Sequence, residues 1–252
     1  MPSIRIRAAR HLWLALTIAL GVSLNLLEPR AAEARTTLGP QDPRRSADVA
    51  ALPLVERPAT GDDPRLAVLL TGDGGFVAAD NSMAAALNRR GISVVGFDSR
   101  NYLSTPRTPE VASGDLARVI RHYTAAWNRP RVLVVGYSRG ADIGPFMVSR
   151  LPEGLRARVA LVALIGPGPA ANFHFHWIDL ASRVVRPDDL AVEPELEKLR
   201  GIPMVCIYGR DDHDAICPRL DPTLARSVER DAGHRVVASD AEDVVAQLLG
   251  RR

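Results

Sequence analysis

The segment Arg131-Val-Leu-Val-Val-Gly-Tyr-Ser-Arg-Gly140 joins an apolar run to the pattern Gly-x-Ser-x-Gly. The apolar run predicts a strand buried on both faces, and a helical pattern follows the second glycine. This context is typical of a nucleophile elbow, a tight turn that lifts a serine side chain above the end of a strand. Small residues must flank such a turn, and the dipole of the following helix favours negative charge on the serine oxygen. Ser138 is therefore the candidate nucleophile.

Further apolar runs lie on both sides of this segment, and helical patterns separate them. The runs span residues 66–70, 93–97, 159–165 and 204–208, and helices are expected near Asp80, near Pro109, after Ser138 and after a capping box at Ser239 and Glu242. The runs are continuous rather than alternating, as in strands covered on both faces. This order predicts an α/β fold, a mostly parallel central sheet with helices on both faces. The longest connection, 166–200, should lie above the carboxyl ends of the strands as a candidate lid.

A serine becomes a nucleophile only with a base and an acid beside it. In this kind of fold the chain order is serine, carboxylate, histidine. The last predicted strand is followed by Asp211, Asp212 and Asp214, and His234 comes shortly before the final helix. Asp212 is favoured as the acid because it stands three residues after the glycine that ends the strand. Asp214 is the alternative acid, and Asp211 is less favoured.

Acyl transfer also requires N–H donors that stabilise the oxyanion. The first predicted donor is the backbone N–H of Arg139, directly after the serine. The second is the backbone N–H of Asp73, in the glycine-rich turn after the strand at 66–70. Glycines such as Gly72 allow the backbone to approach a substrate closely. Nucleotide binding by this turn is disfavoured because Val77 occupies the place of the third glycine in Gly-x-Gly-x-x-Gly.

The first 34 residues predict a secretory signal, with three arginines before an apolar run at 12–27 and a small-x-small site at Ala32-Glu-Ala34. The run is shorter than the roughly 20 residues that cross a bilayer, so a cleaved signal is favoured over an anchor. Residues 35–63 are predicted to be a flexible lead-in with an edge strand near 52–55. Residues 64–252 are predicted to form one domain.

The composition excludes several classes of protein. Removing the signal takes away four Arg and two Glu, which leaves a net charge of +1 and no basic stripe for nucleic acid. A P-loop or a pyridoxal phosphate site needs a lysine, and the single lysine, Lys198, lies in a charged stretch. His174 and His176 lack further ligands at fixed spacing. We therefore expect no cofactor and no metal.

The two cysteines, Cys206 and Cys217, stand 11 positions apart. In an exported protein such a pair favours a disulfide. Two free buried thiols are the alternative, and a metal role is disfavoured.

Four segments carry a resemblance to a known family, and they extend from about residue 66 to the C-terminus. They are Thr71–Phe76, Val94–Glu110, Gly136–Asp142 and Cys206–Cys217. With them the chain resembles the VirJ/AcvB family of bacterial virulence proteins, a branch of the α/β-hydrolases. The resemblance implies an α/β-hydrolase fold and a periplasmic location. It also implies hydrolysis of aminoacylated phosphatidylglycerol, especially the lysyl ester.

Charged residues offer partners for such a substrate. Candidates for the ammonium groups are Asp73, Asp98 and Asp142, and candidates for the phosphate are Arg100, Arg107 and Arg139. We predict a substrate-binding set of Gly72, Asp98, Asp142 and Arg107. For Asp142, which is expected in the first turn of the helix after Ser138, complementing the helix dipole is an equally good explanation. For Asp98, the alternative is a cap or a hydrogen bond within its own loop.

The residue pattern therefore favours a serine ester hydrolase, and we expect a monomer. The resemblance implies that its substrate is an aminoacylated phospholipid at the membrane surface. A generic carboxylesterase is the nearest alternative. A non-catalytic periplasmic adaptor, with secretion-system proteins as partners, and a lipid-binding module without turnover are the others.

Overall fold

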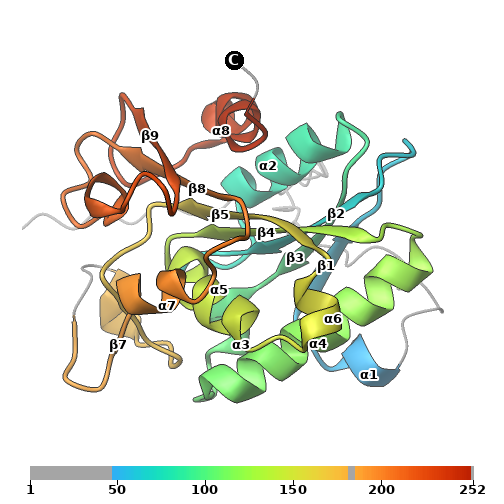
Figure 1. Ribbon diagram of the computed structural model, residues 1–252, viewed down its shortest axis with the longest axis horizontal. Helices are drawn as coiled ribbons and strands as arrows, with labels where there is room; N and C mark the ends of the chain where they lie inside the picture. Colours follow the sequence, from blue (N-terminus) through green and yellow to red (C-terminus); the bar gives the residue numbers. More distant parts are fainter. Residues whose placement is uncertain (1–46, 181–184, 251–252) are drawn as a thin grey trace, which may run out of the picture. The chain divides into compact units, whose positions relative to one another are not determined.

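The computed structural model describes residues 47–180 and 185–250, and Figure 1 shows the arrangement of their helices and strands. The predicted signal lies outside the described residues. A seven-stranded sheet has the order β1-β3-β2-β4-β5-β8-β9. Its strands are β1 (Leu54–Arg57), β2 (Arg65–Leu70), β3 (Ser93–Phe97), β4 (Arg131–Tyr137), β5 (Val159–Ile165), β8 (Met204–Gly209) and β9 (Arg226–Arg230). Only β1 pairs antiparallel within this sheet, so the predicted mostly parallel α/β sheet is confirmed.

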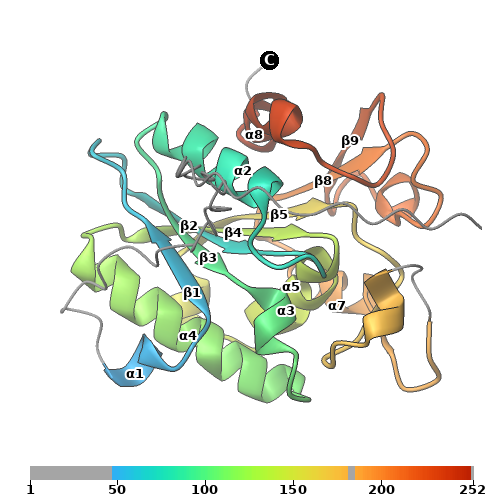
Figure 2. The ribbon, with the colours of Figure 1, turned by 180° about the vertical axis from the view of Figure 1, so that it is seen from behind.

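Helices cover both faces of the sheet, as Figures 1 and 2 show from opposite sides. One face carries α2 (Ala78–Asn88) and α8 (Ala241–Leu248), and the other carries α4 (Pro109–Ala126) and α5 (Arg139–Ser149). Shorter helices are α1 (Ala47–Ala50), α3 (Ser99–Tyr102), α6 (Glu153–Arg156) and α7 (Glu193–Glu197). Successive strand residues point to opposite faces, so Leu69 packs in the α2 layer and Leu70 in the α4 layer. Both layers are apolar, and this explains the continuous apolar runs.

The long connection after β5 contains little regular structure. Its elements are β6 (Ala170–Ala171), the 3-10 helix η1 (Trp177–Leu180) and β7 (Leu190–Ala191), and β6 pairs antiparallel with β7. Two other 3-10 helices are η2 (Cys217–Arg219) and η3 (Ala238–Asp240). Within the described ranges, no helix is both long enough and apolar enough to cross a bilayer.

The five predicted core strands are found to within one residue, and the other two strands lie at the edges of the sheet. The edge strand expected near 52–55 is β1, and Val49, Leu52 and Leu54 around it are buried. The strand β9 was not predicted, because its sequence Arg-Ser-Val-Glu-Arg is mostly polar and its side chains are largely exposed. An edge strand has one unpaired side and needs no apolar run.

The capping box predicted at Ser239 and Glu242 is wrong. The helix α8 begins only after η3, and there the carboxylate of Asp240 accepts a hydrogen bond from the N–H of Val237 at 3.1 Å. The Glu242 carboxylate instead forms an ion pair with Arg90, after the end of α2, with 2.7 Å between nitrogen and oxygen. The ion pair between distant segments thus engages the Glu242 side chain, which the local pattern had assigned to the helix cap.

The predicted disulfide between Cys206 and Cys217 is present, with 5.5 Å between the Cα atoms. It ties β8 to η2, and both half-cystines are buried. It therefore closes the loop that carries the acidic cluster at 211–214.

Reducing this disulfide should lower the free energy of unfolding by roughly 3 kcal/mol, because the open loop gains conformational freedom in the unfolded chain. Urea denaturation with and without reductant measures the change. The Cys206→Ala/Cys217→Ala variant is the control, since its unfolding midpoint should not respond to reductant. An equal midpoint for the oxidised and reduced protein would contradict the prediction.

Candidate functional site

The turn between β4 and α5 has the geometry of a nucleophile elbow. Ser138 adopts φ 52° and ψ −119°, a conformation rare for residues other than glycine. The flanking glycines are required by contact: a Cβ on Gly140 would lie 2.1 Å from the carbonyl oxygen of Leu70, and one on Gly136 would lie 2.4 Å from the oxygen of Gly140. The turn therefore holds the serine at the N-terminus of α5, where the helix dipole favours negative charge.

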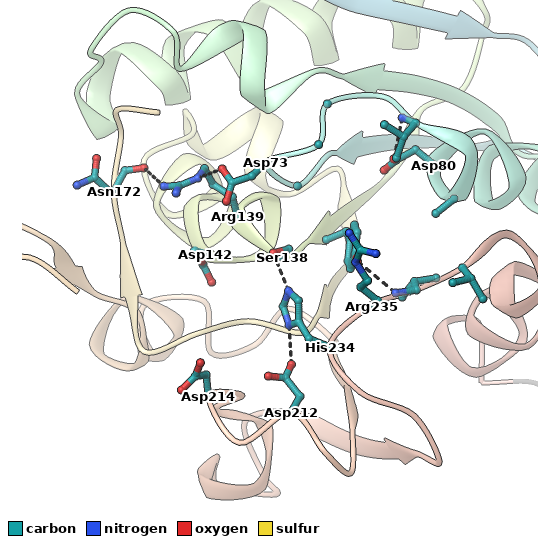
Figure 3. Close-up of a pocket in the computed structure, with 18 of the residues that line it drawn as sticks. Asp73, Asp80, Ser138, Arg139, Asp142, Asn172, Asp212, Asp214, His234 and Arg235 are labelled. Carbon is teal, nitrogen blue, oxygen red and sulfur yellow. Dashed lines mark hydrogen bonds and ion pairs between the residues drawn. The ribbon is translucent and has the colours of Figure 1, made fainter. Parts of the chain in front are cut away.

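Three predicted residues form a continuous hydrogen-bonded chain, drawn in Figure 3. Ser138 Oγ lies 2.8 Å from His234 Nε2, and His234 Nδ1 lies 2.7 Å from Asp212 Oδ2. Asp212 follows β8 and His234 follows β9, so residues 96 and 22 positions apart meet at the carboxyl ends of the strands. With its proton on Nδ1, the imidazole donates to the carboxylate and accepts at Nε2 from the serine hydroxyl. This arrangement is able to move a proton away from Ser138.

The three candidate acids have different positions. The Asp212 side chain is 6% exposed and is the one that bonds His234. Asp214 is exposed and faces the same cavity without a hydrogen bond to the imidazole, as Figure 3 shows. Asp211 is also exposed and lies outside the cavity lining. The favoured candidate therefore has the geometry that an acid needs.

Two residues that the sequence did not single out support the imidazole. Gly166 has φ +61°, and a Cβ there would lie 3.0 Å from His234 Cε1 and 3.3 Å from Asp212 Oδ2. Tyr137 stacks on His234 with 6.1 Å between ring centroids, and its hydroxyl accepts a hydrogen bond from the N–H of Val236 at 3.2 Å. Burial raises the pKa of this phenol, so it stays protonated. The feature that could have pointed to Gly166 is the sequence Gly-Pro-Gly-Pro at 166–169, directly after β5.

The two predicted oxyanion donors are tied together by their side chains. Arg139 Nε donates to the Asp73 carboxylate, and Arg139 Nη1 donates to the carbonyl oxygen of Asn172 at 3.2 Å. A Cβ on Gly72 would lie only 3.2 Å from Ser138 Cβ, so the glycine-rich turn lies against the elbow. Within the described residues, the backbone N–H of Asp73 donates to no protein acceptor. The side chains of Arg139 and Asp73 therefore bind each other, and the glycine-rich turn that carries Asp73 lies beside Ser138.

An open cavity of about 690 Å³ surrounds Ser138 and His234. Its polar lining includes Asp73, Asp80, Asn172, Arg186, Asp189, Asp214 and Arg235. Gly72 and Asp142, which were predicted to bind substrate, also line it. Asp142 is buried and accepts a hydrogen bond from the N–H of Gly168 at 2.7 Å, so it also holds the start of the long connection in place.

The other two predicted substrate contacts, Asp98 and Arg107, do not line this cavity. Asp98 caps α3, where its carboxylate accepts from the backbone N–H of Asn101 at 3.1 Å and from its side-chain amide at 2.7 Å. The Arg107 guanidinium lies over the ring of Tyr102, 4.9 Å from the centroid. Local packing therefore occupies both side chains.

Asp80, at the start of α2, is the least expected part of the lining. It is fully buried, and its Oδ2 accepts from the N–H of Val77 at 3.1 Å while Oδ1 has no partner among the described residues. Burial destabilises the charged form and raises the pKa of Asp80 to about 6. The group therefore takes up a proton in mildly acidic solution.

No three His, Cys, Asp or Glu side chains within 47–180 and 185–250 are grouped as a metal would need. The rings of His174 and His176 contact each other, with centroids 4.5 Å apart. The cavity lining includes the Ser138 hydroxyl, the His234 imidazole and several carboxylates and guanidinium groups.

Comparison with known proteins places this geometry in context. The family model for "Bacterial virulence protein (VirJ)" matches residues 64–251. No curated protein matches the sequence. Among solved structures, MenH from S. aureus is 10% identical, with a TM-score of 0.58 over 78% of this chain and 96% of MenH. A predicted CIB-like hydrolase from Thermoplasma acidophilum is 17% identical, with a TM-score of 0.52 over 80% of this chain and 93% of its own.

A third solved structure, XC6422 from Xanthomonas campestris, is described as an α/β serine hydrolase without lid. It is 14% identical, with a TM-score of 0.50 over 78% of this chain and 87% of its own. Identities this low show the fold alone, and the fold is that of the α/β-hydrolases.

Proposed function

Because the chain belongs to the VirJ family of bacterial virulence proteins, whose matched region here has an α/β-hydrolase fold, we propose that it is a periplasmic serine ester hydrolase. We propose the aminoacyl ester of aminoacylated phosphatidylglycerol, especially the lysyl ester, as its substrate. The observation that carries the proposal is the hydrogen-bonded chain from Ser138 through His234 to Asp212 at the edge of an open cavity.

The proposed reaction uses this chain in two halves. Ser138 Oγ attacks the ester carbonyl carbon while its proton passes to His234 Nε2, and the carbonyl oxygen becomes an oxyanion. The N–H groups of Asp73 and Arg139 are the proposed oxyanion donors. Collapse of this intermediate breaks the bond to the glycerol oxygen, which leaves with the proton from His234. Water then attacks the aminoacyl serine by the same route, releasing the amino acid and restoring Ser138.

The charges around the cavity fit the two ends of an aminoacyl ester of a phospholipid. In the view of Figure 3, Asp142 and Asp214 lie on one side of the Ser138–His234 pair and Arg235 lies on the other. Asp214 has no hydrogen bond or ion pair within the described residues, so it is the proposed contact for an ammonium group. Arg235 is exposed and likewise unpaired within them, which makes it the proposed contact for the phosphate.

Purified protein should release free lysine from lysyl-phosphatidylglycerol in detergent micelles, and a fluorophosphonate probe should label Ser138. Amino-acid analysis measures the release, and mass spectrometry locates the label. Alanyl-phosphatidylglycerol shows whether the second ammonium group matters, since Asp214 should favour the lysyl ester. Folded protein that takes no label and releases no amino acid would overturn the proposal and favour a non-catalytic adaptor.

A further inference from the structure

Exposed apolar side chains lie in the cavity lining and on the connection between β5 and α7 that contributes to this lining. Among the described residues the large exposed ones are Val77, Val111, Trp177, Ile178, Val185, Leu190 and Val237. Val77, Val185 and Val237 line the cavity itself. Trp177, Ile178 and Leu190 belong to the same connection between β5 and α7 that carries Val185. Only Val111, on α4, lies elsewhere, and the other six are called here the apolar rim.

The most exposed members of the apolar rim are neighbours on η1. Trp177 is 71% exposed and Ile178 is 61% exposed. The indole is nevertheless held in place, because its ring meets that of Phe175 edge to face, with centroids 5.3 Å apart, and Phe175 is buried in the core. The guanidinium of Arg100 lies over both rings, 4.9 Å from the Trp177 centroid and 5.4 Å from that of Phe175. A large apolar surface is thus fixed in a position open to solvent.

Charge indicates what covers this surface. Arg100 beside the indole and Arg235 at the cavity form no ion pair with the described side chains. An apolar ring with an unpaired cation beside it suits the boundary between acyl chains and anionic headgroups, where tryptophan and arginine place their apolar parts inward and their polar ends in water. A protein seated on the apolar rim would cover the entrance to Ser138, whereas a bilayer surface would bring lipid esters to it.

We infer that the apolar rim docks on the surface of an anionic lipid bilayer, with Trp177 and Ile178 entering furthest. The docking places the cavity mouth against the headgroups. The inference rests on the proposed function where it favours a bilayer over a protein partner, because a bilayer would bring lipid esters to Ser138. Binding itself needs no catalysis.

Co-sedimentation with vesicles of phosphatidylglycerol and phosphatidylcholine tests the docking in the Ser138→Ala background, so that lipid is not consumed. The Trp177→Ser/Ile178→Ser variant should lose about tenfold or more in vesicle affinity, the loss expected for two large apolar side chains. Val111→Ser is the matched control, because it removes an apolar side chain of 46% exposure away from the apolar rim. Its affinity should equal that of the parent.

Two further measurements test the role of charge in the docking and separate the docking from catalysis. Arg100→Gln should weaken binding to phosphatidylglycerol vesicles and leave the weak binding to pure phosphatidylcholine unchanged. With Ser138 intact, the variant of the two η1 residues should hydrolyse a soluble short-chain ester like the parent and hydrolyse vesicle lipid more slowly. Equal vesicle affinity for this variant and for Val111→Ser would overturn the docking. The docking would also be overturned if the parent protein formed a dimer without lipid and this variant did not. Absence of hydrolysis in every assay would defeat the proposed function and leave the docking result standing.

Discussion

Replacing Ser138 with Ala should lower kcat by about 10⁴-fold to 10⁶-fold, the range seen when a serine nucleophile is removed from a working triad. The loss should be this large because no described residue near His234 offers a second hydroxyl at hydrogen-bond distance. Release of amino acid from aminoacylated phosphatidylglycerol in micelles measures kcat. Circular dichroism and the thermal midpoint check that the fold is intact. Residual activity within tenfold of the parent would show that Ser138 is not the nucleophile.

The three residues should also behave as one unit. Adding His234→Ala to Ser138→Ala should cause almost no further loss of kcat. Without the Ser138 hydroxyl, the imidazole has no serine proton to accept. Asp212→Asn should cost about 10⁴-fold by favouring the wrong imidazole tautomer. Asp211→Asn is the matched control, since it makes the same chemical change one residue away at an exposed position outside the cavity lining. Equal losses for the two variants would contradict the assigned geometry.

The parts of the site that sequence could predict are those fixed by short-range rules. The apolar run before Gly136 and the helical pattern after Gly140 determine the elbow, and its φ of 52° at Ser138 follows from that turn. Chain order and the position after β8 then favour Asp212 over its neighbours. Each of these inferences uses residues a few positions apart or a rule common to the fold.

The errors concern charged side chains that other contacts engage, some of them local and some between distant segments. Asp98 takes the local role that was the alternative to substrate binding, because its carboxylate caps α3, the single turn that directly follows it. Arg107 is likewise engaged by the ring of Tyr102. The ion pair between Arg139 and Asp73 joins residues 66 positions apart, so their backbone roles could be anticipated but their side-chain roles could not. Charged residues in particular take their roles from such tertiary contacts.

The largest loss of stability should come from a single added methyl group, in the substitution of Gly140 by Ala. Gly140→Ala would place a Cβ 2.1 Å from the carbonyl oxygen and 2.5 Å from the carbonyl carbon of Leu70. These are backbone atoms of β2, which is buried and paired on both sides by β3 and β4, so they cannot move aside without breaking the sheet. We expect the free energy of unfolding to fall by more than about 3 kcal/mol, at the upper end for overpacking. Urea denaturation measures the change.

Gly114→Ala is the control, and we expect it to change the free energy of unfolding in the opposite direction. Gly114 lies inside α4, is exposed, and has nothing within 4 Å of the place where a Cβ would stand. The same substitution should there raise the free energy of unfolding by about 0.5 to 1 kcal/mol, because alanine loses less conformational freedom in a helix than glycine does. Opposite signs for one chemical change would show that the backbone contact at the elbow, rather than helix propensity, requires glycine at position 140. If both variants were stabilised, the approach of α5 to β2 would have to be wider than the structure has it, and Ser138 would lose the support that holds it toward His234.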